Sequence, residues 1–175
     1  LNHRFYPGHS IQHWFEKHWL DQTLMQKYDA GGNAIWAAPK AVTSGSSKTF
    51  SANLFDLSGG DYAMVFHTYN FGINSTLYAQ KFDSSGVAQW SSPSQLSNKT
   101  TAFNKIYSGT QDKDTLYFGY SGKTGSQFDS YLQRINPDGT TPWGINGKDF
   151  DVNSTNLEMD TRIASAPGSQ YVWAI

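Results

Sequence analysis

Three ten-residue stretches, KYDAGGNAIW (27–36), KFDSSGVAQW (81–90) and RINPDGTTPW (134–143), follow nearly the same pattern. Each carries Asp or Asn, then Gly three residues later, then Trp four residues after that Gly. A glutamine stands just before each stretch, and the matching residues recur about every 53 positions: Gln26, Gln80 and Gln133; Gly32, Gly86 and Gly139; Trp36, Trp90 and Trp143. Self-similarity at a fixed interval is the signature of a repeat architecture.

The segments around each Asx-x-x-Gly predict β-hairpins. TLMQKY, LYAQKF and SYLQRI precede the three turns and alternate with the period of two that is typical of strands. DAGG, DSSG and NPDG have the residue preferences of a type I turn that closes into a left-handed glycine and a bulge. We therefore expect hairpin tips, with positive φ at the three glycines.

Two more strands are predicted in each repeat. DYAMVFHTY (61–69), DTLYFGYSG (114–122) and SQYVWAI (169–175) match one another, and FSANLFDL, FNKIYSGT and TRIASAPG stand in front of them. Four short antiparallel strands repeated every 40 to 55 residues are typical of a β-propeller blade. The expected fold is therefore all-β, a β-propeller of four-stranded antiparallel blades.

The repeat also predicts how the chain is divided. Residues 1–49 would supply the last strands of one blade, residues 50–98 and 99–152 two further blades, and residues 153–175 the truncated start of another. Four blades at this interval need about 212 residues, and four is the usual minimum for a closed ring. We therefore expect an incomplete ring, which is either a fragment of a larger protein or a unit whose copies close the ring together.

Composition narrows the partners. The net charge is −1 without a run of like charges, which argues against nucleic acid as a partner. No apolar stretch approaches the roughly 18 residues of a membrane span, so membrane insertion is not expected. The chain has no cysteine, which excludes disulfides and a thiol nucleophile.

The pattern Q-K-[YF]-D-x-x-G-x-x-x-W at 26–36 and 80–90, with the variant QRINPDGTTPW at 133–143, resembles propeller-like repeats of exported Bacteroidetes surface proteins. The resemblance covers about residues 22–175. It implies a location outside the cell or on its surface, reached through type IX secretion, and it indicates a repeat type more than a function.

Two groups of residues are candidates for chemistry. His9, His13 and His18 lie in HSIQHWFEKHWL, where His9 and His13 would share one face of a helix and could bind metal. The repeat register instead places IQHWF (11–15) opposite VFHTY (65–69), which favours a strand, and no cofactor is expected. Asp112 with Asp114, and Glu158 with Asp160, are carboxylate pairs that could act as acid and base or stand in solvated turns.

The recurring residues favour a structural interpretation. A residue that every repeat needs at the same depth is most simply a packing element, with Trp filling the interface between blades and the Gln amide satisfying backbone groups. The sequence thus predicts a non-catalytic binding or scaffold module that contacts glycan or protein through its loops, while further blades or other copies of the chain cover its open faces. The alternative is a propeller enzyme of the glycoside-hydrolase type that uses paired carboxylates.

Overall fold

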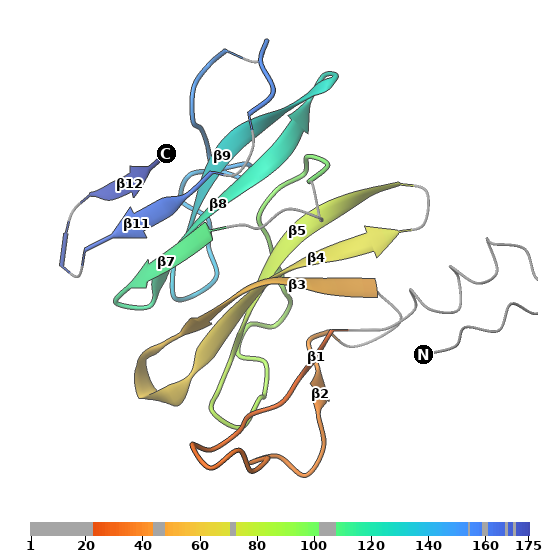
Figure 1. The fold of residues 1–175 in the computed structure, drawn as a ribbon, viewed down its shortest axis with the longest axis vertical. Coiled ribbons are helices and arrows are strands. Elements are labelled where there is room, and N and C mark those ends of the chain that lie inside the picture. The colour runs from red at the N-terminus through yellow and green to blue at the C-terminus, as the bar shows by residue number, and fades with distance from the viewer. Residues whose placement is uncertain are drawn as a thin grey trace, which may run out of the picture.

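The structure is a computed structural model, and it describes residues 23–43, 48–70, 73–101, 108–153, 155–158, 161–166, 168–169 and 171–175. Within these ranges the chain forms antiparallel β-sheets, none of them closed into a barrel or ring, and no α-helix (Figure 1). The all-β prediction is confirmed. The described residues accordingly contain no helix that could cross a membrane.

The first large sheet has four strands: β3 (Lys48–Asp56), β4 (Tyr62–Asn70), β5 (Ile73–Phe82) and β6 (Ser94–Gln95). Neighbours in the sheet are neighbours in the chain, in the order β3-β4-β5-β6. A short 3-10 turn, Ser58–Gly60, joins β3 to β4. The sheet is therefore a simple antiparallel meander.

The second large sheet repeats this arrangement with β7 (Ser108–Asp112), β8 (Thr115–Thr124), β9 (Gln127–Ile135) and β10 (Lys148–Asp149). Its strands again follow chain order, β7-β8-β9-β10. As in the first sheet, the last strand is only two residues long, because the chain leaves the sheet through the hairpin tip before it pairs again.

Two smaller sheets stand at either end of the described chain. One pairs β1 (Leu24–Met25) with β2 (Lys40–Ala41), and its register is that of β5 with β6, 54 residues later in the chain. The other pairs β11 (Ile163–Ser165) with β12 (Val172–Ala174), in the register of β7 with β8, 55 residues earlier. One small sheet thus matches the second half of a four-stranded sheet, and the other matches the first half.

Two hydrophobic clusters join the sheets face to face. One lies between the large sheets, where Val65, Leu77 and Leu96 meet Phe118 and Ile135. The other lies on the opposite face of the first large sheet, where it meets the small sheet. Its members are Met25, Val42, Met64, Phe66 and Phe82. The first large sheet is therefore covered on both faces, which explains why β5 is apolar at consecutive positions rather than at alternate ones.

The first strands of successive sheets lie next to one another, β3 beside β7 and β7 beside β11 (Figure 1). At Gly109 on β7, an added Cβ would lie 2.3 Å from Cζ of Phe55 on β3. The absence of a side chain at Gly109 is therefore what allows the Phe55 ring to approach β7. Between β7 and β11, the hydroxyl oxygens of Thr110 and Ser165 are 2.9 Å apart.

A buried histidine ties the first large sheet to the segment that leads to the second. His67 on β4 is 1% exposed, and its Nδ1 lies 3.0 Å from Oγ1 of Thr101. The N–H of Thr101 donates to the carbonyl of Ser75 on β5 at 3.0 Å, while Thr101 also bridges to Gly122 on β8. Burial lowers the pKa of His67 to about 4 because a charged imidazolium is poorly solvated in the interior.

We expect His67 to make the fold sensitive to acid. Its pKa rises from about 4 in the folded chain to an ordinary value of about 6.5 on unfolding. The unfolded state therefore binds the proton first, and stability is lost as the pH falls from about 6.5 to 4. The loss should be about 3 kcal/mol of unfolding free energy, at about 1.4 kcal/mol per pKa unit.

Urea unfolding between pH 7.5 and 4 measures this loss, and His67→Gln is the comparison because it cannot be protonated. The carboxylates titrate in both proteins, so the difference between the two curves isolates the histidine. Parallel curves would contradict the assignment.

Candidate functional site

The three Asx-x-x-Gly segments form hairpin tips with the same backbone geometry. Their glycines have φ of 83°, 82° and 86° at Gly32, Gly86 and Gly139. Each glycine N–H donates to the carbonyl three residues before it: Gly32 to Asp29 at 3.0 Å, Gly86 to Asp83 at 2.9 Å, and Gly139 to Asn136 at 2.8 Å. The predicted turns and positive φ values are confirmed.

The recurring glutamines brace these hairpins from inside. Each amide Nε2 donates across the tip to a backbone carbonyl: Gln26 to Trp36 at 3.0 Å, Gln80 to Trp90 at 3.2 Å, and Gln133 to Gly144 at 2.8 Å. Each Oε1 also accepts from the N–H of the following residue. In the third hairpin the acceptor lies one residue later, where WGING replaces the earlier pattern, and Gln133 bonds Leu96 of the neighbouring sheet as well.

The tryptophans connect one tip to the next. A Cβ added at Gly86 would lie 3.0 Å from Cζ2 of Trp36, and one added at Gly139 would lie 2.8 Å from Cδ2 of Trp90. The glycine that provides positive φ thus also provides the space against which the preceding repeat's indole packs. A second link accompanies each contact: Lys40 Nζ donates to the Ser85 carbonyl at 2.5 Å and Ser94 Oγ to the Gly139 carbonyl at 2.6 Å.

The prediction that Trp36, Trp90 and Trp143 are largely buried is wrong, because all three are half-buried. Trp36 and Trp90 pack against the edges of the two hydrophobic clusters. Their rings lie between projecting tips rather than between the sheets themselves, and this leaves part of each ring open to solvent. Nor are they fully exposed rings of the kind that line a binding groove.

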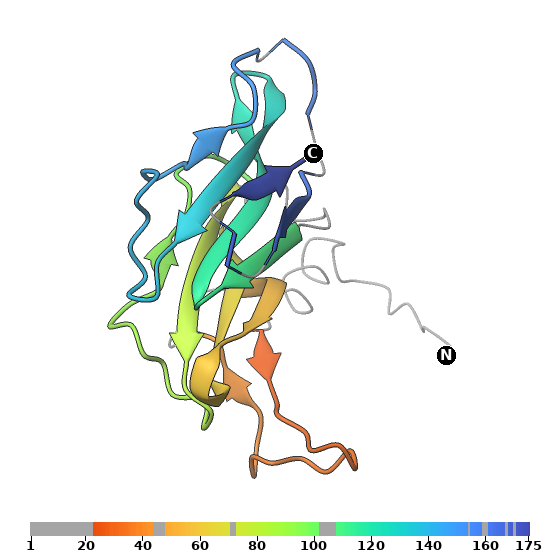
Figure 2. The ribbon, with the colours of Figure 1, turned by 90° about the vertical axis from the view of Figure 1, so that its left-hand side faces the viewer.

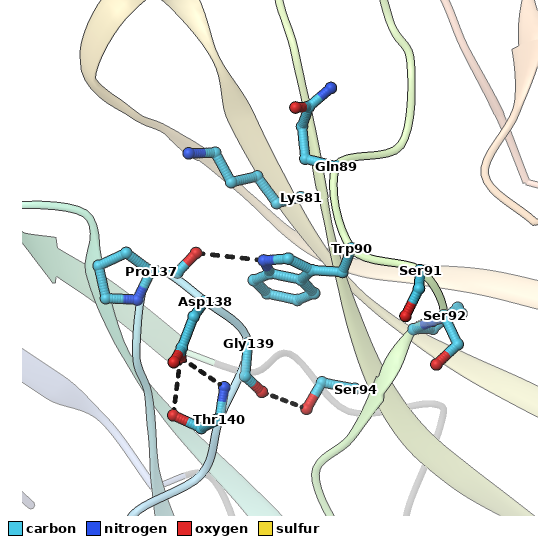
Figure 3. Close-up of a pocket in the computed structure, with 11 residues that line it drawn as sticks. Lys81, Gln89, Trp90, Ser91, Ser92, Ser94, Pro137, Asp138, Gly139 and Thr140 are labelled. Atoms are coloured by element: carbon cyan, nitrogen blue, oxygen red, sulfur yellow. Dashed lines mark hydrogen bonds between the residues drawn. The ribbon is translucent and has the colours of Figure 1, made fainter.

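A groove of about 600 Å³ opens where the second tip meets the third (Figure 3). Trp90 lies across it and donates through Nε1 to the Pro137 carbonyl at 3.1 Å. The rest of its lining is mainly polar: Lys81, Gln89, Ser91, Ser92, Pro93, Ser94, Asp138, Gly139 and Thr140. The N–H and hydroxyl of Thr140 donate to the Asp138 carboxylate and lower its pKa. With this single carboxylate the groove suits binding of hydroxyl or amide groups but offers no acid and base pair.

Carboxylates gather at the far end of the second large sheet. Asp129 on β9 is 1% exposed, and neither of its side-chain oxygens has a hydrogen-bond partner among the described residues. Burial, followed by the charge of Asp129, raises the pKa of Asp149. Burial also raises the pKa of Glu158, and Asp151 adds to this shift. Two protonatable acids therefore stand close to two others.

Sequence reasoning found only one member of this cluster. Glu158 was a candidate, but its expected partner Asp160 lies outside the described residues. Asp129, Asp149 and Asp151 were missed. A signal for Asp129 existed, because it shares one face of β9 with Tyr131, Gln133 and Ile135, which are buried. A charged residue on the core face of a strand is unusual enough to mark a site for inspection.

The other predicted carboxylate pair serves to link sheets. Asp114 accepts from the N–H of Ser58 at 2.8 Å and from its hydroxyl, and the latter bond is the main reason its pKa is lowered. Asp112 accepts from the N–H of Gly168 at 3.3 Å. Both therefore bind segments that adjoin neighbouring sheets, which supports the structural interpretation of the pair.

The predicted histidine metal site cannot be placed, because His9, His13 and His18 lie outside the described residues. Among the residues that are described, no three His, Asp or Glu side chains are arranged to hold a metal ion.

We expect Trp90→Ala to lower the unfolding free energy by about 2 kcal/mol, which is less than for a fully buried Trp because the ring is only half-buried. Trp173→Ala is the matched control, since Trp173 is 73% exposed and its loss should change stability by no more than about 0.5 kcal/mol. Chemical denaturation of both variants measures the difference. Equal losses would show that the contact with Gly139 contributes little.

Comparison of the chain with protein-family models, with curated proteins and with solved structures found no match. The interpretation of its role consequently depends on the contacts described above. Those contacts place the recurring Gln, Gly and Trp residues in the joints between hairpins and sheets.

Proposed function

We propose that the chain is a non-catalytic β-propeller module that acts as a binding or scaffold part of an exported bacterial surface protein. The observation that carries this proposal is the contact made twice between the tryptophan of one tip and the glycine of the next, Trp36 with Gly86 and Trp90 with Gly139. A joint that recurs at the same place in successive units is how a repeat protein fixes the angle between its units.

The order of the strands supports the same proposal. In a propeller, four-stranded antiparallel sheets pack face to face, with their first strands nearest the centre. The two large sheets have this strand order, and β3, β7 and β11 adjoin one another. Residues 50–98 and 99–152 would then be complete blades, with residues 1–49 and 153–175 contributing parts of two others.

A scaffold or binding role agrees with how the polar side chains are used. The recurring Gln amides, Asp112 and Asp114 all bond the chain's own backbone. Contacts with a glycan or protein partner would instead come from the loops at the tips, where the groove beside Trp90 is lined by hydroxyls and an amide. The resemblance of the repeat to exported Bacteroidetes proteins supports a location outside the cell.

Titration of the purified chain with a panel of glycans and matrix proteins, with product analysis of the same mixtures, tests this role. We expect binding without turnover, weakened at least tenfold by Ser92→Trp, which would fill the groove. Asn156→Trp adds the same ring to another exposed loop and should leave binding unchanged. Turnover of a bound glycan, or equal effects of both variants, would argue against the proposal.

A second candidate is a glycoside hydrolase, and the raised pKa values of Asp149 and Glu158 favour it. A carboxylic acid that stays protonated beside a carboxylate is what such an enzyme requires. If the chain released sugars from any glycan, Asp149→Asn and Glu158→Gln should abolish release, while Asp56→Asn, at an exposed position, should not. Our proposal predicts that the unmodified chain releases none.

A further inference from the structure

The series of Trp and Gly contacts has an open position at each end. Gly86 is covered by Trp36, and Gly139 by Trp90, but no atom lies within 4 Å of the place where a Cβ of Gly32 would be. At the other end, Trp143 has the ring of Tyr117 from its own sheet at 6.0 Å. Among the described glycines, none has Trp143 among the nearest atoms that its Cβ would meet.

The two small sheets are incomplete in complementary ways. The β1-β2 pair has the register of the last two strands of a large sheet, and the β11-β12 pair has that of the first two. Strand β12 pairs with β11 on one side only, in the part of the structure that is described. An unpaired strand edge is a template for a further strand.

Apolar side chains are exposed at both of these incomplete sheets. On β12 and beside it, Tyr171, Trp173 and Ile175 are 73%, 73% and 81% exposed. On the hairpin that carries β1 and β2, which projects from one end of the molecule (Figure 2), Leu24 and Tyr28 are 60% and 62% exposed. Exposed apolar surface concentrated at two sites indicates that both are contact surfaces.

We infer that two copies of this chain join head to tail, with β1 of one copy pairing beside β12 of the other. The joined sheet would have the order β11-β12-β1-β2, which is the four-stranded arrangement of both large sheets. The tip of one copy would then bring Gly32 against Trp143 of its neighbour, so that the contact seen within the chain continues across the interface. Because Gly32 and Trp143 are different surfaces, the contact is heterologous.

This inference rests on the proposed function to the extent that it treats the sheets as blades. What it adds is the occupant of the open faces, a second copy, and the two residues that meet. The supporting observation is continuity, since the expected contact is the one the chain already makes twice at the same spacing.

Complementary variants test the inference by light scattering on size-separated protein. Gly32→Asn places a side chain where the indole should sit, and Asn tolerates positive φ better than other residues. Trp143→Ala removes the ring. The unmodified chain should exceed 19.5 kDa increasingly with concentration, while each variant alone should remain near that mass. An equal mixture of the two variants should recover a two-chain complex, because one still offers Trp143 and the other Gly32.

Gly125→Asn is the matched control, since Gly125 also has positive φ and open space around it, and this variant should associate like the unmodified chain. A monomer at every concentration would overturn the inference and leave the open faces to a further repeat of a longer polypeptide. So would variants that associate normally, or a mixture that forms no complex. If Trp90→Ala still destabilised a monomeric chain, the proposed module would stand and only the second copy would be removed.

Discussion

The contact between an indole ring and the glycine of the next hairpin tip is the joint on which the arrangement of the sheets depends. It imposes two demands on one residue. The turn needs φ near +80°, which a side chain makes costly, and the neighbouring ring needs the space that a Cβ would occupy. Glycine meets both, so a single position fixes the local turn and the distance between successive units.

Burial of the sheets follows from that joint. Once one tip is fixed against the next, the sheets behind them meet face to face, and the first large sheet is covered on both sides. Its strands must then be apolar on both faces, as Leu77, Ala79 and Phe82 are. The polar residues that remain inside are held by specific bonds, as with Gln133 and with His67, whose neutral imidazole lies beside Thr101.

The same economy of polar groups bears on function. Side chains that looked suitable for binding or catalysis, such as the recurring Gln residues and the pair Asp112 and Asp114, are occupied by backbone groups of the chain itself. The carboxylates with raised pKa values lie elsewhere, at Asp149 and Glu158, and the polar groove lies at the tips. A scaffold with loops free to vary is consistent with this separation between residues that hold the fold and surfaces that face outward.

The sequence by itself determined the strands, the hairpin tips and the positive φ of Gly32, Gly86 and Gly139, because these depend on local alternation and on backbone sterics that a few neighbouring residues set. It also indicated the structural use of the Gln amides, since repetition implies a shared environment. Only the tertiary structure decided that each Trp is half-buried against the glycine of the following tip, and that Asp129, Asp149, Asp151 and Glu158 come together. Those features depend on the distance and angle between sheets and on where a loop returns to β9, which are set by packing between segments far apart in the chain.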